Sequence, residues 1–401
     1  WEPGEKTWRR STPPLLTREV KALHDYGVDV YSVPCRFYKS YTFLSPLINV
    51  DKSKFEYTIE TWKPVGCEEY CESRGFSNIE ACVEKCEEED WRTLVKATET
   101  VKLWKETDDK SIMIPRGLTH LVPECADKVN YTTLTQKPTS PGDYEGLRDY
   151  QAKVGDSVLR ALEKYGGGII QVATGGGKSY MAGWLAKQLI RNGYIVFTTS
   201  LSIDLTLQLR EFARKWGVDA VAVTVQTLYR RILGEKNGNG NGGEEDEEDK
   251  VIQQYMDVED LTKQQEDELR RMFFNRKVAV ILDEAHHVPS HTVKRIMSEA
   301  GDGNALRIGL SATPWRNDGR DLEVEGYVGP IVEPRVTSTF LIQHGYAVPV
   351  TIHLIRTGHW DCGGGSYASV RKCLSRSTDR NNLILDILRN AEKPTLVLTT
   401  L

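Results

Sequence analysis

The chain has 401 residues, 39% of them hydrophobic, and a formal net charge of −5. This length and apolar content allow two or three domains with well-packed cores and exclude a mostly unfolded protein. Every apolar run is shorter than the roughly 20 residues that a membrane-spanning helix needs, and the start lacks the pattern of a signal peptide. We therefore expect an intracellular, cytoplasmic protein without a membrane partner. Because the first residue is Trp1 and not methionine, we also expect a longer product.

The negative charge is concentrated in one segment. Residues 244–249 are six consecutive acids, and without them the net charge changes from −5 to about +1. The Asn and Gly residues that precede these acids cannot pack, so residues 235–250 are predicted to be a disordered acidic insert. A nucleic-acid partner would have to be bound by a local basic surface, because the rest of the chain is nearly neutral.

Residues 1–145 mix strand and helix patterns and are predicted to form a smaller α+β accessory domain. Residues 28–38 and 55–62 read as strands, and residues 90–104 have a helical pattern. The segment 35–43 interleaves basic and aromatic residues, which suits base stacking and phosphate contact. The same composition is typical of a strand that buries its rings, and we favour that interpretation.

Four of the eight cysteines have a regular spacing: Cys67, Cys71, Cys82 and Cys86 form two pairs, each four residues apart, on one face of a helix. A hairpin of two such helices would set Cys67 against Cys86 and Cys71 against Cys82 for two disulfides, whereas four thiolates could instead hold Zn²⁺. We favour disulfides, which inside a cell would indicate a thermophile or a virus of one. The other cysteines are expected to be buried apolar residues: Cys35, Cys125, Cys362 and Cys373.

From residue 146 helices alternate with short apolar strands, which predicts a parallel sheet covered on both faces. Residues 146–345 are therefore expected to form an α/β nucleotide-binding domain, with residues 346–401 as a connector to further structure. The predicted helices include residues 178–192, 202–216 and 251–274. The predicted strands are residues 168–172, 194–198, 220–223, 278–282 and 307–310.

A phosphate-binding pattern stands after the first of these strands, where three glycines precede Lys178 and Ser179. Glycines let backbone N–H groups point at phosphate oxygens, and the start of the following helix favours an anion. Lys178 would reach the β and γ phosphates, and Ser179 would bind Mg²⁺. Val172 occupies the position where the strict pattern has its first glycine, which leaves an ordinary glycine-rich turn as the alternative.

The strand at residues 278–282 ends in two acids, Asp283 and Glu284. Adjacent carboxylates at the carboxyl end of a parallel strand, beside a phosphate loop, suit nucleoside triphosphate hydrolysis. Asp283 would hold Mg²⁺, and Glu284 would orient and deprotonate the attacking water. Because neighbouring strand residues point to opposite sides, the two acids are expected to have different roles.

Three segments together resemble the superfamily 2 helicases of the DEAD/DEAH type, and they follow the order of that family: residues 173–179, 283–286 and 311–314. Residues 309–319 are similar to the branch that holds DNA repair helicases, phage recombination helicases and restriction motors. The resemblance implies RecA-like domains, ATP and Mg²⁺ as cofactors, and single-stranded or branched duplex DNA as the partner.

The resemblance also implies roles for individual residues. ATP would be bound by Gln151, Thr174, Gly175, Gly176, Gly177, Lys178 and Ser179, and Lys178, Asp283 and Glu284 would be catalytic. Mg²⁺ would be held by Ser179 and Asp283. ATP state would be coupled to movement by His286, Ser311, Ala312 and Thr313. The nucleic-acid backbone would be contacted by Thr199, Ser200, Gln208, Gln226 and Thr227.

The function that follows is an ATP-dependent DNA helicase or translocase, which unwinds or remodels duplexes in replication, recombination or repair. Residues 380–383 and 395–398 look like the start of a second RecA-like domain, whose arginine motif is missing. We therefore expect these residues alone to bind ATP but to hydrolyse it weakly. The alternatives are a restriction motor, for which no nuclease motif precedes residue 145, an RNA helicase, and a module that uses nucleotide only as a switch.

Overall fold

The computed structural model describes residues 34–46, 48–75, 78–88, 93–126, 130–234, 261–316, 318–350, 367–391 and residue 395. The described residues form two compact units, one that ends at Ala347 and one that begins at Val348. The predicted acidic insert lies outside the described residues.

The first unit contains a five-stranded parallel sheet, and its strand order is β7-β11-β10-β8-β9. Every residue of β7, β10 and β11 is buried, which explains their continuous apolar sequences. The predicted α/β class is confirmed, and each strand boundary lies within one residue of the predicted one. The strands are β7 (Gly167–Gln171), β8 (Ile195–Thr199), β9 (Val221–Ala222), β10 (Val278–Asp283) and β11 (Leu306–Ser311).

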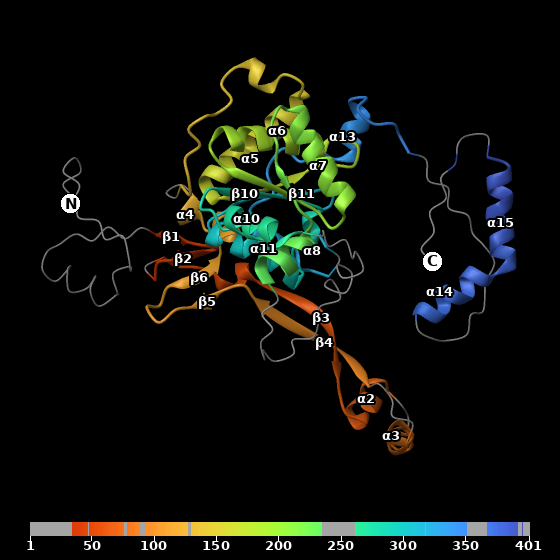
Figure 1. The fold of residues 1–401 in the computed structure, drawn as a ribbon. Coiled ribbons are helices and arrows are strands. Elements are labelled where there is room, and N and C mark those ends of the chain that lie inside the picture. The colour runs from red at the N-terminus through yellow and green to blue at the C-terminus, as the bar shows by residue number, and fades with distance from the viewer. Residues whose placement is uncertain are drawn as a thin grey trace, which may run out of the picture. The chain divides into compact units, whose positions relative to one another are not determined.

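Helices cover both faces of this sheet (Figure 1). One face packs against α5 (Asp149–Tyr165), α6 (Lys178–Arg191) and α7 (Ile203–Lys215). The other face packs against α8 (Val225–Thr227), the π-helix η4 (Leu228–Gly234), α10 (Lys263–Phe273) and α11 (His291–Glu299). The part of the predicted polar helix that is described is α10, and residues 251–260 lie outside the described residues.

Shorter helices complete this part of the unit: η5 (Ala285–His287), η6 (Ala300–Gly303), α12 (Asp321–Tyr327) and α13 (Ser338–Gln343).

Two antiparallel sheets precede the parallel one. The first has the order β1-β2-β6-β5, and the second pairs β3 with β4. Their strands are β1 (Cys35–Tyr38), β2 (Tyr41–Leu44), β3 (Glu56–Pro64), β4 (Leu94–Lys102), β5 (Lys105–Glu106) and β6 (Ile112–Pro115). The helices around them are η1 (Lys52–Phe55), α2 (Cys67–Ser73), α3 (Ile79–Glu88), η2 (Arg116–Leu121), α4 (Pro123–Ala126) and η3 (Pro141–Tyr144).

The helix predicted over residues 90–104 is wrong, because Leu94–Lys102 is strand β4. The pairing with β3 extends over nine residues and sets Val101 opposite Tyr57 and Thr100 opposite Thr58. Such cross-strand contacts between β-branched and aromatic residues stabilise a hairpin, and they outweigh the local helical spacing.

The cysteine-rich hairpin is confirmed as a disulfide-linked pair of helices. α2 and α3 lie at the end of the β3–β4 hairpin (Figure 1), and disulfides join Cys67 to Cys86 and Cys71 to Cys82. The structure thus has the disulfide alternative and not the zinc alternative at these four cysteines.

The prediction for the remaining cysteines is wrong in part. Cys35 and Cys125 are buried, but they form a third disulfide, and Cys373 is also disulfide-bonded. Cys35 and Cys125 are 90 residues apart in the chain, so no local spacing in the sequence indicates that they pair. Cys362 lies outside the described residues.

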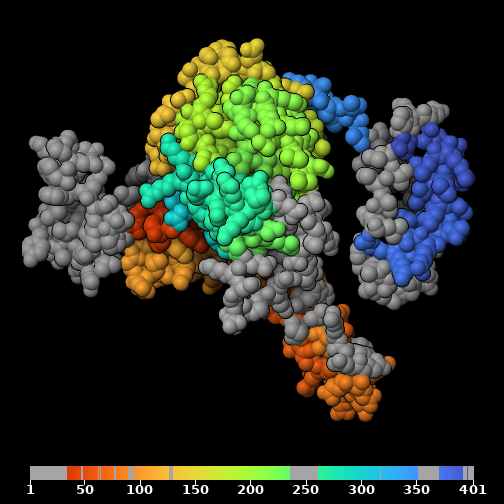
Figure 2. Space-filling view, viewed as in Figure 1, coloured from red at the N-terminus to blue at the C-terminus, as the bar shows by residue number. Residues whose placement is uncertain are grey.

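Two buried arginines join the first antiparallel sheet to the parallel sheet. Arg116 of η2 donates to the carbonyl oxygens of Lys39 and Ala305, at 2.9 and 2.6 Å. Arg307 of β11 donates to the Ser40 hydroxyl oxygen at 2.8 Å. In Figure 2 the red and orange atoms of the N-terminal sheet lie directly against the cyan atoms of the parallel-sheet region.

The second unit has two helices among its described residues, α14 (Tyr367–Arg376) and α15 (Thr378–Arg389). Residues 380–383 fall within α15, and residues 396–398 lie outside the described residues. In neither unit do the described residues include a helix long and apolar enough to cross a membrane.

We predict that the Cys35–Cys125 disulfide stabilises the first unit. Replacing both cysteines by serine should lower the free energy of unfolding by about 2–4 kcal/mol, because the bond closes a long loop between β1 and α4. Urea unfolding monitored by tryptophan fluorescence measures this. The matched control is Cys71→Ser with Cys82→Ser, whose loop lies inside the helical hairpin, and it should change the unfolding of the unit by less than about 1 kcal/mol. Equal losses in the two variants would contradict the prediction.

Candidate active site

The carboxyl edge of the parallel sheet brings three predicted segments together. β11 lies between β7 and β10, and it pairs Ser311 with Gln171 and Leu310 with Asp283. The glycine loop that follows β7, the acids that end β10 and the serine that ends β11 therefore meet at one edge. In open α/β sheets this edge is where ligands bind.

The glycine loop has the backbone that a phosphate cradle requires. Gly175 and Gly177 have φ angles of +82° and +81°, which favour glycine. Gly177 is the N-cap of α6, a 14-residue helix, and no side chain caps the N–H groups of its first turn. These groups and the helix dipole are thus available to an anion.

Val172 is compatible with this loop although it replaces a glycine. Its side chain is fully buried, and a Cβ atom added at Gly176 would lie 2.4 Å from Val172 Cγ1. Close packing against Val172 thus makes glycine necessary at position 176, so the unusual residue helps to shape the loop.

Gln151 packs directly on the loop. Its Nε2 donates to the Gly176 carbonyl oxygen at 3.0 Å, and its Oε1 accepts from the Arg148 backbone at 2.9 Å. The hydroxyl of Tyr150 donates to the same Gly176 carbonyl oxygen at 2.8 Å. The sequence did not single out Tyr150, because its aromatic neighbours Phe340 and Tyr346 lie far along the chain.

The two acids differ in environment. Asp283 is buried, and this burial, with the charge of Glu284 adding to it, raises the pKa of Asp283, while Lys178 opposes the shift. Glu284 is partly exposed and has a φ angle of +52°, a left-handed conformation that is strained for a residue with a side chain. The carboxylate of Glu284 lies 4.0 Å from Lys178 Nζ and 3.3 Å from His286 Nδ1.

The predicted coupling residues lie beside these acids. His286 Nδ1 is 3.4 Å from Ser311 Oγ, which also accepts from the Thr313 backbone at 3.2 Å. Ala312 stands between them in the chain. The structure therefore connects Glu284 to the segment 311–313 through one histidine ring.

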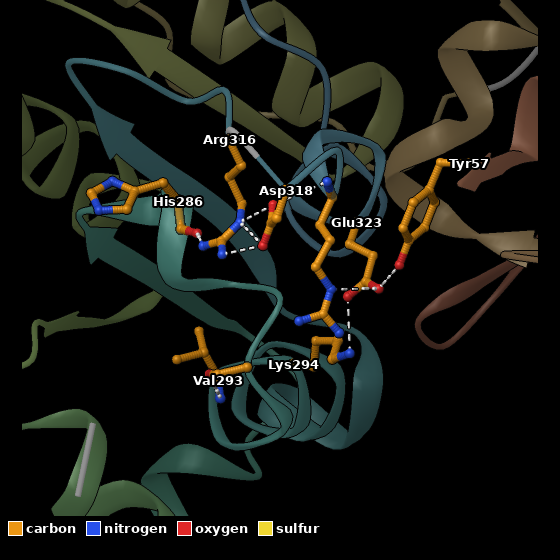
Figure 3. A network of polar contacts seen from close by, with 9 residues as sticks. Tyr57, His286, Val293, Lys294, Arg316, Asp318 and Glu323 are labelled. Carbon is orange, nitrogen blue, oxygen red and sulfur yellow. Dashed lines mark hydrogen bonds and ion pairs between the residues drawn. The ribbon is translucent and has the colours of Figure 1, made fainter. Parts of the chain in front are cut away.

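Arg316 extends this connection and was not predicted individually. Its NH1 donates to the His286 carbonyl oxygen at 2.7 Å, and its Nε donates to Asp318 at 2.8 Å (Figure 3). On the following helix α12, Glu323 accepts from Lys294 Nζ at 2.9 Å and from the hydroxyl of Tyr57 on β3. Only the resemblance of the segment 309–319 pointed to this region.

The predicted nucleic-acid residues are mostly buried. Thr199, Ser200, Gln226 and Thr227 are each 3% exposed or less, whereas Gln208 is exposed on α7. Thr199 Oγ1 and Ser200 Oγ have no hydrogen-bond partner among the described residues. In this conformation a nucleic-acid strand cannot reach their side chains. Contact at these four residues would have to be made by their backbone groups or follow a rearrangement.

Comparison with known proteins finds a family whose model matches part of the chain. The model of the family described as "Type III restriction enzyme, res subunit" matches residues 145–316, which include the glycine loop, both acids and the segment 311–313. Residues 145–316 are thus similar to the superfamily 2 helicases, and we call them the helicase domain below.

Relatives of this helicase domain come from archaea and from viruses. The chain is 31% identical to "Putative helicase 22" of Sulfolobus islandicus filamentous virus, over 51% of the chain and 34% of the relative. It is 26% identical to "Putative ATP-dependent RNA helicase L396" of Acanthamoeba polyphaga mimivirus, over 51% and 34%. It is 31% identical to "DNA 3'-5' translocase XPB2" of Sulfurisphaera tokodaii, over 46% and 35%. The matched region thus spans about one third of the length of each relative.

Among solved structures, the UvsW helicase of bacteriophage T4 is similar at 13% identity, over 75% of this chain and 99% of that chain. The TM-score is 0.36, which is too low to compare individual elements.

The helicase domain has donors that fit a nucleotide-bound Mg²⁺ ion. The described residues contain no cluster of three or more His, Cys, Asp or Glu side chains suited to a metal. Mg²⁺ with a nucleotide needs few protein ligands, because phosphate oxygens and water supply most of its six positions. Asp283 and Ser179 are the side chains that would hold it, since Asp283 ends β10 and Ser179 lies in the first turn of α6, at the same sheet edge.

We predict that ionised Asp283 destabilises the nucleotide-free protein. Because its pKa is raised in the folded state, its contribution to stability is present below the unfolded pKa and is lost as pH rises through the folded pKa. At neutral pH, Asp283→Asn should therefore unfold at a higher urea concentration than the unchanged protein. At a pH low enough to protonate the carboxyl group, the two proteins should unfold at the same urea concentration.

The control is Asp219→Asn, because hydrogen bonds from Arg210 lower the pKa of Asp219 to about 2. Ionised Asp219 therefore stabilises the folded protein, which is the opposite of the effect expected for Asp283. Asp219→Asn should destabilise the protein at neutral pH. A destabilised Asp283→Asn variant at neutral pH would contradict the assignment.

Proposed function

We propose that this protein is an ATP-dependent motor that moves along DNA and unwinds or remodels duplexes. The observation that carries the proposal is the joint position of the glycine loop, Asp283 and Glu284 at one sheet edge, with His286 linking Glu284 to Ser311. The match to the helicase family and the similarity to the archaeal DNA translocase support it.

The roles of the residues follow from their chemistry. The N–H groups at the start of α6 and Lys178 bind the phosphates of ATP, and they stabilise the charge that develops on the γ phosphate. Glu284, which is partly exposed beside Lys178, orients the attacking water and accepts its proton. Mg²⁺ at Asp283 and Ser179 would neutralise the β and γ phosphate oxygens.

Coupling to movement would use the His286–Ser311 contact. Glu284 and Ser311 both lie within 3.4 Å of His286 Nδ1, so loss of the γ phosphate near Glu284 can shift the imidazole. Ser311 also holds the Thr313 backbone, and Arg316 holds the His286 carbonyl oxygen. A change at the nucleotide is thus passed to residues 311–318 through hydrogen bonds.

Two other functions have support of their own. The name of the family model favours the motor subunit of a restriction system, and the name of the mimivirus relative favours an RNA helicase. We prefer DNA because the segment 309–319 resembles the DNA repair and recombination branch. Strand displacement on matched DNA and RNA duplexes separates the DNA motor from the RNA helicase, and equal or greater activity on RNA would favour the RNA helicase.

We predict that Lys178 and Glu284 have separable effects. Glu284→Gln should retain ATP binding but reduce hydrolysis by about 10²- to 10⁴-fold, because the amide cannot accept the proton of the water. Lys178→Ala should weaken binding itself, because it removes a charge that contacts phosphate. Equilibrium binding of a fluorescent ATP analogue and phosphate release measure the two effects. Glu299→Gln, at the carboxyl end of α11, is the control and should change neither. Hydrolysis by Glu284→Gln at the unchanged rate would refute the assignment.

We also predict that Ser311→Ala uncouples hydrolysis from movement. The substitution removes the oxygen that contacts His286 and accepts from Thr313, but it leaves Lys178, Asp283 and Glu284 in place. Hydrolysis should fall by no more than about tenfold, which corresponds to about 1.4 kcal/mol, while strand displacement is lost. Parallel loss of both activities would show that Ser311 serves the chemistry instead. If Lys178→Ala leaves strand displacement unchanged, the protein does not use ATP as a motor.

A further inference from the structure

A pocket of about 170 Å³ opens on the N-terminal sheet, outside the residues that match the helicase family. It lies where the β4–β5 connection meets β2, β6 and the end of α12. The residues that matter for its chemistry are Tyr41, Lys102, Trp104, Lys105, Met113 and Tyr327.

The walls of this pocket are aromatic, and one of them is held in a fixed orientation. Trp104 Nε1 donates to Glu56 Oε1 at 2.8 Å, which anchors the polar edge of the indole. Lys52 Nζ and Lys102 Nζ lie 4.5 and 5.4 Å from the centre of the Trp104 ring. The hydrogen bond holds the indole in place, so a planar ligand that displaces the flexible lysine side chains from the ring can stack on it at a low entropic cost.

The charge of the pocket is positive. Lys102 and Lys105 are exposed, and among the described residues neither has a carboxylate partner. Glu106 is nearby, but it is paired with Lys52 at 3.1 Å and with Lys110 at 3.2 Å. No carboxylate is among the described residues that line the pocket. The ligand that fits is anionic and carries a planar ring.

We propose that this pocket binds single-stranded nucleic acid, with a base stacked between Tyr41 and Trp104 and the backbone phosphates on Lys102 and Lys105. Alternating rings and cations are the arrangement by which proteins bind single strands without reading their sequence. The pocket would thus bind a segment of nucleic acid other than the one on which the motor acts. This second binding site goes beyond the proposed function.

The position of Tyr327 connects the pocket to the motor. Tyr327 is the last residue of α12, and Glu323 of the same helix accepts from Lys294 on α11 (Figure 3). The first residue of α12, Asp321, accepts from the backbone N–H of Arg316, whose side chain holds the His286 carbonyl oxygen. A nucleic-acid strand bound in the pocket would therefore contact α12, which is linked by hydrogen bonds through Arg316 to His286 beside the ATP site.

The test measures the affinity of a fluorescein-labelled oligothymidylate by anisotropy. Lys102→Glu with Lys105→Glu should weaken binding at least tenfold and reduce the slope of log affinity against log salt by about 1 to 2, because two phosphate contacts are lost. The control is Lys63→Glu with Lys96→Glu, which makes the same charge change at exposed positions of the β3–β4 hairpin. It should change the affinity by less than about twofold.

A second measurement does not depend on charge. Oligothymidylate should quench part of the tryptophan fluorescence of the unchanged protein, and Trp104→Leu should lose that part. Equal weakening by the two double variants, or quenching that persists in Trp104→Leu, would overturn the proposal. Binding of the ATP analogue should be the same in all these variants. A result that contradicts the pocket proposal would therefore leave the proposed motor function untouched.

Discussion

The hydrogen bonding of β11 between β7 and β10 is the constraint on which the active site depends. The glycine loop and the two acids belong to strands that are not neighbours in the sheet, and β11 sets both the distance between them and the position of Ser311. Because all three strands are fully buried, a slip in their pairing would expose apolar residues along their whole length. The fold therefore fixes the relative positions of the loop, the acids and Ser311 through its core, and the contacts among the site residues add to this.

The buried arginines extend this rigidity to the N-terminal sheet. Arg116 and Arg307 are almost completely buried, and burial lowers the pKa of both guanidinium groups. Their charges are compensated mainly by carbonyl oxygens and by the ring of Tyr131, whose centre lies 4.1 Å from Arg116. Separating the two sheets would leave these carbonyl groups and guanidinium groups without partners, which is costly. The sheet with the aromatic pocket and the helicase domain are thus expected to move as one body.

Sequence reasoning succeeded where the signal was local. The turn of the glycine loop, the acids at the end of β10 and the disulfide-linked helices each lie within one short stretch, so local spacing was enough to predict their geometry, while the roles of the loop and the acids remain predictions. It failed where distant segments decide the outcome: β4 is a strand because β3 pairs with it, and Cys35 bonds to Cys125, which lies 90 residues later in the chain. Arg316 belongs to the second kind, because its partner His286 lies 30 residues earlier in the chain.

Several features of the active site oppose folding and are explained by what the site binds. Glu284 has a left-handed backbone, Asp283 is an acid whose pKa is raised by burial, and the first turn of α6 has no side-chain cap. Each of these features is unfavourable in the free protein. A phosphate at the start of α6 and a cation beside Asp283 would relieve two of them at once. Nucleotide binding should therefore order this edge of the sheet, and the energy released there is available to shift His286 and the segment that it contacts.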